Sequence, residues 1–336
     1  MNQRAQNRTL RTTVGRVFQT YGLALMIAIM VVVFAALNEN FLTLSNFQNI
    51  LEQNAALMIV AVGVTFAIIS TAIDLSPGSV IALVGVIIAL VHRDTESIAL
   101  ALVSGMAVAL LIGAFNGVLI SSVGINPVIV TLAAFIWARG LALALTEKDS
   151  IVIQSGFIGF MNERFLELIS PPMVLIVLAY LFGFFMLNKT RLGRYTYALG
   201  GDEAAAKQAG VPTELYKIGL FLFSGIMVGL GAIITVSRMG AAQPNAVFGL
   251  ELDAIAAVII GGNRLSGGEG GLRQTIFGVI FLAILNNGLS TLGLRDASFY
   301  FYKGLVILFA LFFEVTSRRM LREARTSSTL AQPAAD

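Results

Sequence analysis

Long hydrophobic runs separated by short polar segments dominate the pattern of this chain. Windows without any Asp, Glu, Lys or Arg include 53–73, 97–138, 168–188 and 274–294. A transmembrane helix needs about 20 apolar residues, and the 42 residues of 97–138 are enough for two helices joined by a turn. The pattern therefore predicts an all-α, polytopic membrane protein.

The pattern predicts about ten transmembrane helices. They cover 21–37, 55–73, 78–92, 98–120, 127–146, 172–188, 218–237, 250–262, 273–293 and 299–314. Pro follows a capping residue at Ser76-Pro77, Asn126-Pro127 and Ser170-Pro171, as at many helix starts. The eighth segment is short, and irregular backbone beside it would have to be covered by protein or line a wet cavity.

Composition supports the membrane assignment. Of 336 residues, 57% are hydrophobic and only 12% are charged, whereas soluble domains have about 25% charged residues. This excludes an ordinary soluble enzyme, a disordered chain and a nucleic-acid binder. The chain contains no cysteine, so disulfides and thiolate chemistry are excluded as well.

The distribution of basic residues predicts the orientation. With both termini inside, 15 Lys and Arg residues lie on inner segments and 5 lie in outer loops, while Arg139 and Lys303 fall within spans, which accounts for all 22. An excess of Lys and Arg marks the cytoplasmic side. We predict a cytoplasmic tail at 1–20, a transmembrane domain at 21–314 and a cytoplasmic tail at 315–336, with one large cytoplasmic loop at 189–217.

A weak internal repeat divides the chain into halves. Leu75-Ser76-Pro77-Gly78, Asn116-Gly117 and Arg139-Gly140-Leu141 are followed by Leu265-Ser266-Gly267-Gly268, Asn287-Gly288 and Lys303-Gly304-Leu305. The spacings differ, so coincidence is the alternative. Five spans per unit would make the halves inverted, as in many transporters.

The large inner loop carries the signals of a short helix. Asp202 is placed to cap it, Glu203, Ala204 and Ala205 follow, and Gly210 ends it. A helix this short is marginal alone, so we expect it to dock on a cytoplasmic partner; a solvated connector is the alternative. The candidate docking residues are Gly193, Arg194, Gly200, Gly201, Asp202, Glu203, Ala204, Ala205 and Gly210.

Two charges and several amides are candidates for function inside the membrane. Asp74 and Arg139 fall in apolar surroundings, where charge is costly and marks a functional or pairing role. Pairing for structure alone is the alternative. Several amides and one aromatic ring fall within or beside the predicted spans, and the candidates lining a pathway are Asn116, Asn126, Trp137, Asn286 and Asn287. Hydrogen bonding between helices is the alternative for each.

No catalytic or metal-binding set is visible. His92 is the only histidine, which is too few for a metal site. Leu265-Ser266-Gly267-Gly268-Glu269 resembles the signature sequence of ABC ATPases, but no phosphate-binding G-x-x-x-x-G-K-[ST] loop is present. We predict a tight glycine-rich turn there, and a chain that is not an enzyme.

The motifs resemble those of the membrane subunit of bacterial ribose-type ABC importers. The resemblance rests on segments 73–79, 126–132, 138–140, 191–210, 251–262, 286–288 and 303–308, and it extends over about 20–314. It implies a homodimeric permease in the bacterial inner membrane that moves a pentose or hexose. It further implies a cytoplasmic ATPase docked at 200–210, an extracytoplasmic sugar-binding protein, and ATP on the ATPase, with no cofactor on this chain.

Other functions remain as alternatives. A branched-chain amino-acid ABC permease would share the architecture, but its substrate carries both charges. An ion-coupled secondary transporter would need a coupling carboxylate, for which Asp74 is the candidate. A membrane enzyme would need paired catalytic residues.

Overall fold

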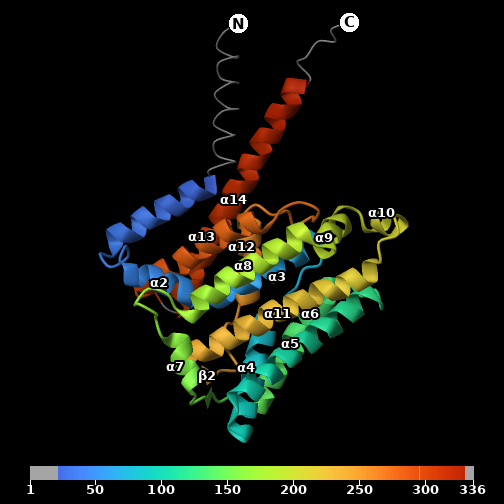
Figure 1. The fold of residues 1–336 in the computed structure, drawn as a ribbon. Helices are drawn as coiled ribbons and strands as arrows, with labels where there is room; N and C mark the ends of the chain where they lie inside the picture. Colours follow the sequence, from blue (N-terminus) through green and yellow to red (C-terminus); the bar gives the residue numbers. More distant parts are fainter. Residues whose placement is uncertain (1–21, 295, 330–336) are drawn as a thin grey trace, which may run out of the picture.

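The computed structural model describes residues 22–294 and 296–329. It is a bundle of helices, seen in Figure 1, with one antiparallel strand pair, Ile151–Val152 (β1) and Ala241–Ala242 (β2). The predicted tail 1–20 lies outside the described residues, as does the 330–336 part of the predicted C-terminal tail.

The first described helix, Gly22–Leu37, precedes the labelled ones. In chain order these are α2 (Leu44–Gln53), α3 (Ala55–Ile69), α4 (Pro77–Thr95), α5 (Ile98–Ser121), α6 (Pro127–Leu145), α7 (Gly156–Asn162), α8 (Pro171–Lys189), α9 (Arg191–Gly201), α10 (Glu203–Gln208), α11 (Thr213–Met239), α12 (Leu250–Ile260), α13 (Leu272–Thr291) and α14 (Asp296–Thr329).

The polytopic helical class is confirmed. Among the described residues six helices are long and apolar enough to cross a membrane, or seven if the bent pair α2 and α3 forms one span. Helix Gly22–Leu37 and the apolar part of α14, Ala297–Phe312, are shorter than these. A helix is found at each of the ten predicted segments, but helix length supports fewer than ten crossings.

Helix starts differ in detail from the predicted caps. The side chain of Asn126 accepts a hydrogen bond from the backbone N–H of Val128 at 2.9 Å, as expected for a cap. Ser76 and Ser170 precede prolines but make no such bond. The Ser76 hydroxyl instead donates to Asp74, so the sequence signal located the helix start but not the role of the side chain.

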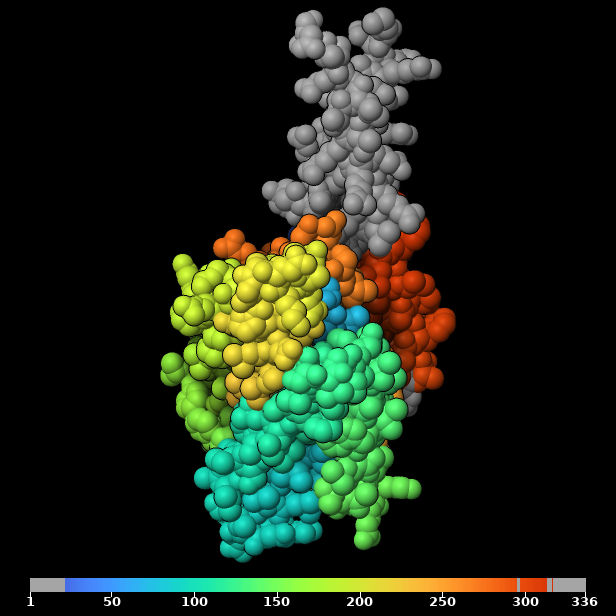
Figure 2. All heavy atoms as spheres, turned by 90° about the vertical axis from the view of Figure 1, so that its right-hand side faces the viewer, coloured from blue at the N-terminus to red at the C-terminus, as the bar shows by residue number. Residues whose placement is uncertain are grey.

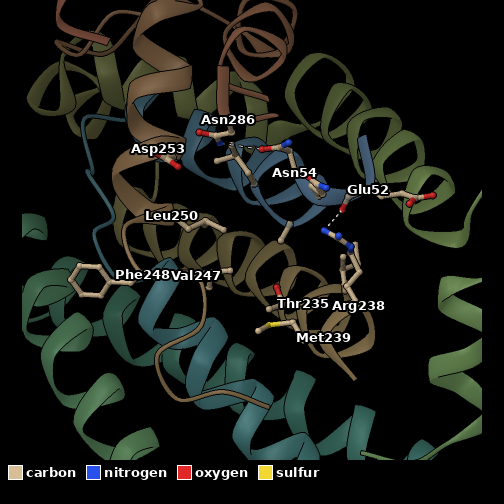
Figure 3. Close-up of a pocket in the computed structure, with 14 residues that line it drawn as sticks. Glu52, Asn54, Thr235, Arg238, Met239, Val247, Phe248, Leu250, Asp253 and Asn286 are labelled. Atoms are coloured by element: carbon tan, nitrogen blue, oxygen red, sulfur yellow. Dashed lines mark hydrogen bonds between the residues drawn. The ribbon is translucent and has the colours of Figure 1, made fainter. Parts of the chain in front are cut away.

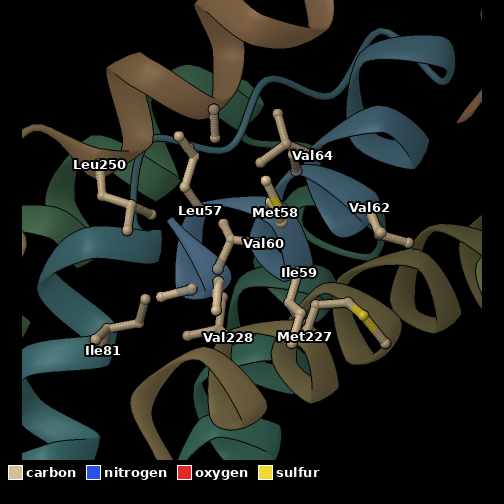
Figure 4. Close-up of a cluster of buried hydrophobic side chains, with 14 of the residues drawn as sticks. Leu57, Met58, Ile59, Val60, Val62, Val64, Ile81, Met227, Val228 and Leu250 are labelled. Atoms are coloured by element: carbon tan, nitrogen blue, oxygen red, sulfur yellow. The ribbon is translucent and has the colours of Figure 1, made fainter. Parts of the chain in front are cut away.

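Helix α3 is the centre of the bundle, and all fifteen of its residues are buried. Figure 4 shows its side chains meeting Ile81 of α4, Met227 and Val228 of α11 and Leu250 of α12. Lipid tails are as apolar as these side chains, so close packing rather than water exclusion holds such helices together.

Small residues bring α5 and α11 into close contact. A Cβ on Gly225 would lie 2.8 Å from the carbonyl oxygen of Ala109, and a Cβ on Gly113 would meet the carbonyl of Phe221. This reciprocal backbone approach is the small-residue packing expected between membrane helices.

A bend of 48° separates α2 from α3 at Asn54. Helices α9 and α10 lie at one end of the bundle, and α7 with the strand pair lies at the opposite end (Figure 1). The candidate sites lie at the α9–α10 end and at the α2–α3 bend.

Candidate functional site

Helix α10 is the short helix predicted in the large loop, and the structure adds a second helix, α9, directly before it. Asp202 caps α10 by accepting the N–H of Ala205 at 3.0 Å, as predicted. Glu203 pairs with Lys217 of α11 at 2.5 Å, and Gly210 ends the segment at φ +83°. Because α10 has only six residues, these flanking contacts are what hold it in place.

The faces of α10 differ in exposure. Ala206 is buried, whereas Ala204 and Ala205 are exposed. Glu203, Lys207 and Gln208 are exposed as well, so the two alanines form a small-residue spot between longer polar side chains, where a partner surface can approach the helix closely.

Helix α9 touches two other segments of the bundle. A Cβ on Gly200 would collide with the carbonyl of Ile69, at the end of α3, and with the N–H of Gly268. The Gly268 N–H itself donates to the Ile69 carbonyl at 2.9 Å. The Tyr197 hydroxyl donates to the Gly270 carbonyl at 2.8 Å, and burial raises the pKa of this tyrosine. Figure 2 shows the yellow α10 region, the orange α12–α13 turn and the blue end of α3 close together.

The turn between α12 and α13 is the predicted glycine-rich turn. Gly267, Gly268 and Gly270 have φ values of +77°, +73° and +129°, which L side chains rarely adopt. Arg264 and Glu269 close the turn with an ion pair at 2.6 Å. The Leu265–Glu269 sequence thus has a local structural explanation.

The two charges Asp74 and Arg139 are buried, but they do not pair with each other. Asp74 is 3% exposed and accepts from the Ser76 N–H at 2.9 Å, the Ser76 hydroxyl at 2.6 Å and the Ser224 hydroxyl at 3.2 Å. This explains how a carboxylate is held at the α3–α4 junction without a cation.

Arg139 reaches from α6 to the start of α4 and to the chain before α12. It donates to Ser79 at 3.3 Å and to the carbonyls of Pro244 and Ala246 at 2.6 and 3.0 Å. Its guanidinium also lies 5.9 Å from the centre of the Phe248 ring, a cation–π distance. Arg139 therefore ties two helix starts together.

The first turns of α4 and α12 meet directly. A Cβ on Gly78 would collide with the carboxylate of Glu251 and lie 3.0 Å from the carbonyl of Val247. Helix N-termini carry partial positive charge, so Glu251 and Asp253 in the first turn of α12 partly balance it.

A cavity of about 280 Å³ opens beside this junction, at the α2–α3 bend. Its lining comes from α2, α3, α11, α12, α13 and the chain before α12 (Figure 3). The polar lining residues are Glu52, Gln53, Asn54, Thr235, Arg238, Asp253 and Asn286. Its volume is close to the lower limit of about 300 Å³ for small-molecule sites.

Both carboxylates of the cavity are paired with cations behind its wall. Glu52 is bound by Arg164 through two bonds of 2.9 Å, which raise the pKa of Arg164. Asp253 is paired with Lys303 of α14 at 2.5 Å. Arg238 donates to the backbone carbonyl of Glu52 at 2.8 Å.

Comparisons with known proteins show the family to which this chain belongs. A family profile described as "Branched-chain amino acid transport system / permease component" matches residues 46–311. The chain belongs to this permease family. No solved structure matches the chain.

Individual relatives are similar over most of both chains. The permease is 35% identical over 288 residues to the ribose import permease protein RbsC of Escherichia coli, covering 84% of this chain and 89% of the relative. It is 37% identical over 297 residues to RbsC of Bacillus subtilis, covering 88% and 92%. It is 34% identical over 301 residues to the L-arabinose transport system permease protein AraH of Escherichia coli, covering 89% and 92%. The resemblance to ribose-type ABC permeases is confirmed.

The predicted pathway residues of the permease lie in different places. Asn286 lines the cavity and donates to Asn54 at 3.1 Å. Asn287 is buried and exchanges two 3.0 Å bonds with Asn46. Among the other three, Asn116 is 2% exposed, Asn126 caps α6 and Trp137 is 38% exposed; none of them lines the cavity. Their roles in a pathway stay predictions.

Sequence reasoning missed most of the cavity. Glu52, Gln53 and Arg238 stand at the edges of charge-free windows, where charged and polar residues are expected at the membrane surface. Asp253 lies near the start of the eighth predicted segment, where an acidic residue ordinarily balances the helix N-terminus. The position of Glu52, Gln53 and Arg238 at the ends of charge-free windows was the only signal in the sequence. That signal does not show which helix ends lie next to each other in the folded protein.

Proposed function

We propose that the chain is the pathway subunit of an ATP-driven importer that moves a monosaccharide, a pentose or hexose, into the cytoplasm. The observation that carries this proposal is similarity over most of the chain to permeases named for ribose and L-arabinose. The bundle of apolar helices supports it. The chain performs no chemistry and needs no cofactor of its own, because ATP binds to the partner subunit.

The proposed assembly contains two copies of this chain, a cytoplasmic ABC ATPase and an extracytoplasmic sugar-binding protein, in the bacterial inner membrane. The ATPase docks on α9 and α10, with Ala204 and Ala205 as central contacts. Their exposure and the small size of their side chains support this. The remaining docking residues are Gly193, Arg194, Gly200, Gly201, Asp202, Glu203 and Gly210.

Contacts of α9 suggest how movement at the docking end reaches the pathway. Gly200 touches the end of α3 and the α12–α13 turn, and both α3 and α12 line the cavity. A shift of α9 on ATP binding would therefore move two cavity walls, biasing the inward- and outward-facing populations.

The proposed topology has ten spans in two inverted five-helix repeats, with both termini cytoplasmic and a permease domain at 21–314. Arg139 and Lys303, which occupy matching places in the repeat, each bond to the first turn of another helix. Arg139 of α6 reaches Ser79 in the first turn of α4, and Lys303 of α14 reaches Asp253 in the first turn of α12. The same two first turns meet each other at Gly78 and Glu251.

A branched-chain amino-acid substrate is the second candidate. The description of the matching family favours it. An ion-coupled transporter has no comparable support: Asp74 is buried and held by two serines, and the relatives are ABC permeases by family.

Co-purification from native membranes tests the proposal. An ATP-binding protein should be captured with the tagged chain and lost with Ala205→Glu, which places charge and bulk on the exposed face of α10. Ala99→Glu is the matched control, because Ala99 is an exposed alanine at the start of α5, and capture should persist. Absence of any ATPase from the wild-type sample would contradict the importer assignment. Capture by both wild type and Ala205→Glu would contradict the docking site alone.

A further inference from the structure

The cavity at the α2–α3 bend has no assigned ligand, and its chemistry is selective. Among the described residues, the lining includes three side-chain amides, those of Gln53, Asn54 and Asn286. The Thr235 hydroxyl and the Arg238 guanidinium complete its uncharged and cationic polar groups. Amides and hydroxyls can both donate hydrogen bonds to a ligand hydroxyl and accept them from it, whereas the guanidinium only donates.

One amide of the wall has spare capacity. Asn286 donates to Asn54, but its own Oδ1 accepts no hydrogen bond in the described part of the chain. A buried acceptor without a donor is costly unless a ligand or water supplies one. This oxygen is buried in the described structure, so the Asn286 side chain must turn and release Asn54 to offer it to a hydroxyl in the cavity.

An aromatic residue stands at the rim of the cavity. Phe248 is 63% exposed, and Figure 3 shows its ring pointing away from the amides of Asn54 and Asn286. Arg139 and Phe135 contact this ring, at 5.9 and 6.3 Å between centres, and so fix its position.

The paired carboxylates limit the charge of the ligand. Glu52 is engaged by Arg164 and Asp253 by Lys303, so neither carboxylate is free to receive an ammonium group. Arg238 is held at the carbonyl of Glu52 and lies beside its carboxylate charge. An α-amino acid placed here would leave its ammonium group without a partner, which is costly in a poorly hydrated site.

We propose that this cavity binds one neutral monosaccharide within the permease itself, and that the Glu52–Arg164 and Asp253–Lys303 pairs exclude ammonium-bearing ligands. The proposal rests on the importer function above. It places substrate selection in this chain as well as in the protein that delivers the sugar.

A ligand panel tests the charge argument. The full chain, purified with its ATPase partner in lipid nanodiscs and without any binding protein, is titrated with labelled D-ribose, and then with L-leucine and D-galacturonate as competitors. D-Ribose should bind, and unlabelled D-ribose should displace it while the two charged competitors should not. Displacement by L-leucine would overturn the exclusion of ammonium groups, and displacement by D-galacturonate would show that Arg238 serves a carboxylate.

Variants test the location. Asn286→Ala should weaken D-ribose binding roughly two- to tenfold, the range for one neutral hydrogen bond. Met239→Trp should abolish binding, because Met239 is a 42% exposed lining residue and the indole would fill the cavity. Ser45→Trp, exposed on α2 but outside the lining, is the control and should bind like wild type.

Transport by the same variants separates the two proposals. ATP-driven D-ribose uptake by wild type and equally by Met239→Trp would overturn the cavity assignment and leave the importer function standing. Absence of ATP-driven uptake of D-ribose, D-allose and L-arabinose by the wild-type assembly would overturn both.

Discussion

Lys303 of α14 forms an ion pair with Asp253 in the first turn of α12, with 2.5 Å between Nζ and Oδ2. Both side chains are largely buried, at 11% and 19% exposure. The pair joins two helices that are 50 residues apart in sequence and forms the back of the cavity wall. A charge in this position depends on its partner, because removal of either one leaves the other desolvated and unpaired.

Lys303→Gln should therefore destabilise the permease by roughly 3 kcal/mol, the lower end of the range for an unpaired buried charge. The measurement is the thermal unfolding midpoint in detergent. The double variant Asp253→Asn/Lys303→Gln should recover most of the loss, since no charge is left alone. Arg93→Gln is the control: its pair with Asp94 is more than 60% exposed, and such pairs contribute only about 0–1 kcal/mol.

Gly200 and Gly201 are adjacent but should respond differently to substitution. A Cβ on Gly200 would collide with the backbone of Ile69 and Gly268, whereas nothing lies within 4 Å of a Cβ on Gly201. Gly200→Ala should cost about 1–3 kcal/mol through overpacking and reduce sugar-stimulated ATPase activity. Gly201→Ala should leave the free energy of unfolding at the wild-type value, and equal destabilisation by the two variants would contradict the described contact.

Arg164 holds the loop between α7 and α8 against α2. It binds Glu52 twice, Gln48 at 3.0 Å and Asn49 at 2.9 Å. Charge-assisted hydrogen bonds contribute about 1.5–3 kcal/mol, so Arg164→Ala should accelerate hydrogen exchange at 163–170 by roughly tenfold or more. Lys148→Ala, at an exposed lysine of the preceding loop, should not change exchange there.

Asp74 should prove structural rather than ion-coupling. Asp74→Asn keeps an oxygen that accepts from the Ser76 N–H, so uptake should persist and should keep the pH dependence of the wild type. Asp74→Ala removes both oxygens that accept hydrogen bonds from the hydroxyls of Ser76 and Ser224. This variant should therefore have a lower unfolding midpoint. Abolished uptake in a stable Asp74→Asn variant would revive the ion-coupled alternative.

The helices were largely predictable from sequence because lipid imposes long apolar runs. Pro127 and Pro171 marked helix starts correctly, and Asp202 marked the start of α10. Arg139 and Lys303, the two basic residues predicted to fall within spans, each bond to the first turn of another helix. Each of these signals is local, within a few residues of the feature that it predicts.

The cavity was not predictable in the same way, because its residues meet only through the packing of distant helices. Asn54 and Asn286 are 232 positions apart, and Glu52 gains its partner Arg164 across 112 positions. The bend at Asn54 carries neither Pro nor Gly, so no turn signal indicated it. Asn286 and Asn287 are neighbours, yet one lines the cavity and the other pairs with Asn46, a difference set by the helical rotation between them.

ATP-driven sugar uptake tests the central claim most directly. The chain is reconstituted into proteoliposomes with its co-purified ATPase and sugar-binding protein, and labelled D-ribose uptake is followed with ATP or a non-hydrolysable analogue on the ATPase side. The account predicts uptake with ATP only, unchanged when proton and sodium gradients are collapsed. Uptake that proceeds without ATP and stops when a gradient is collapsed would contradict it.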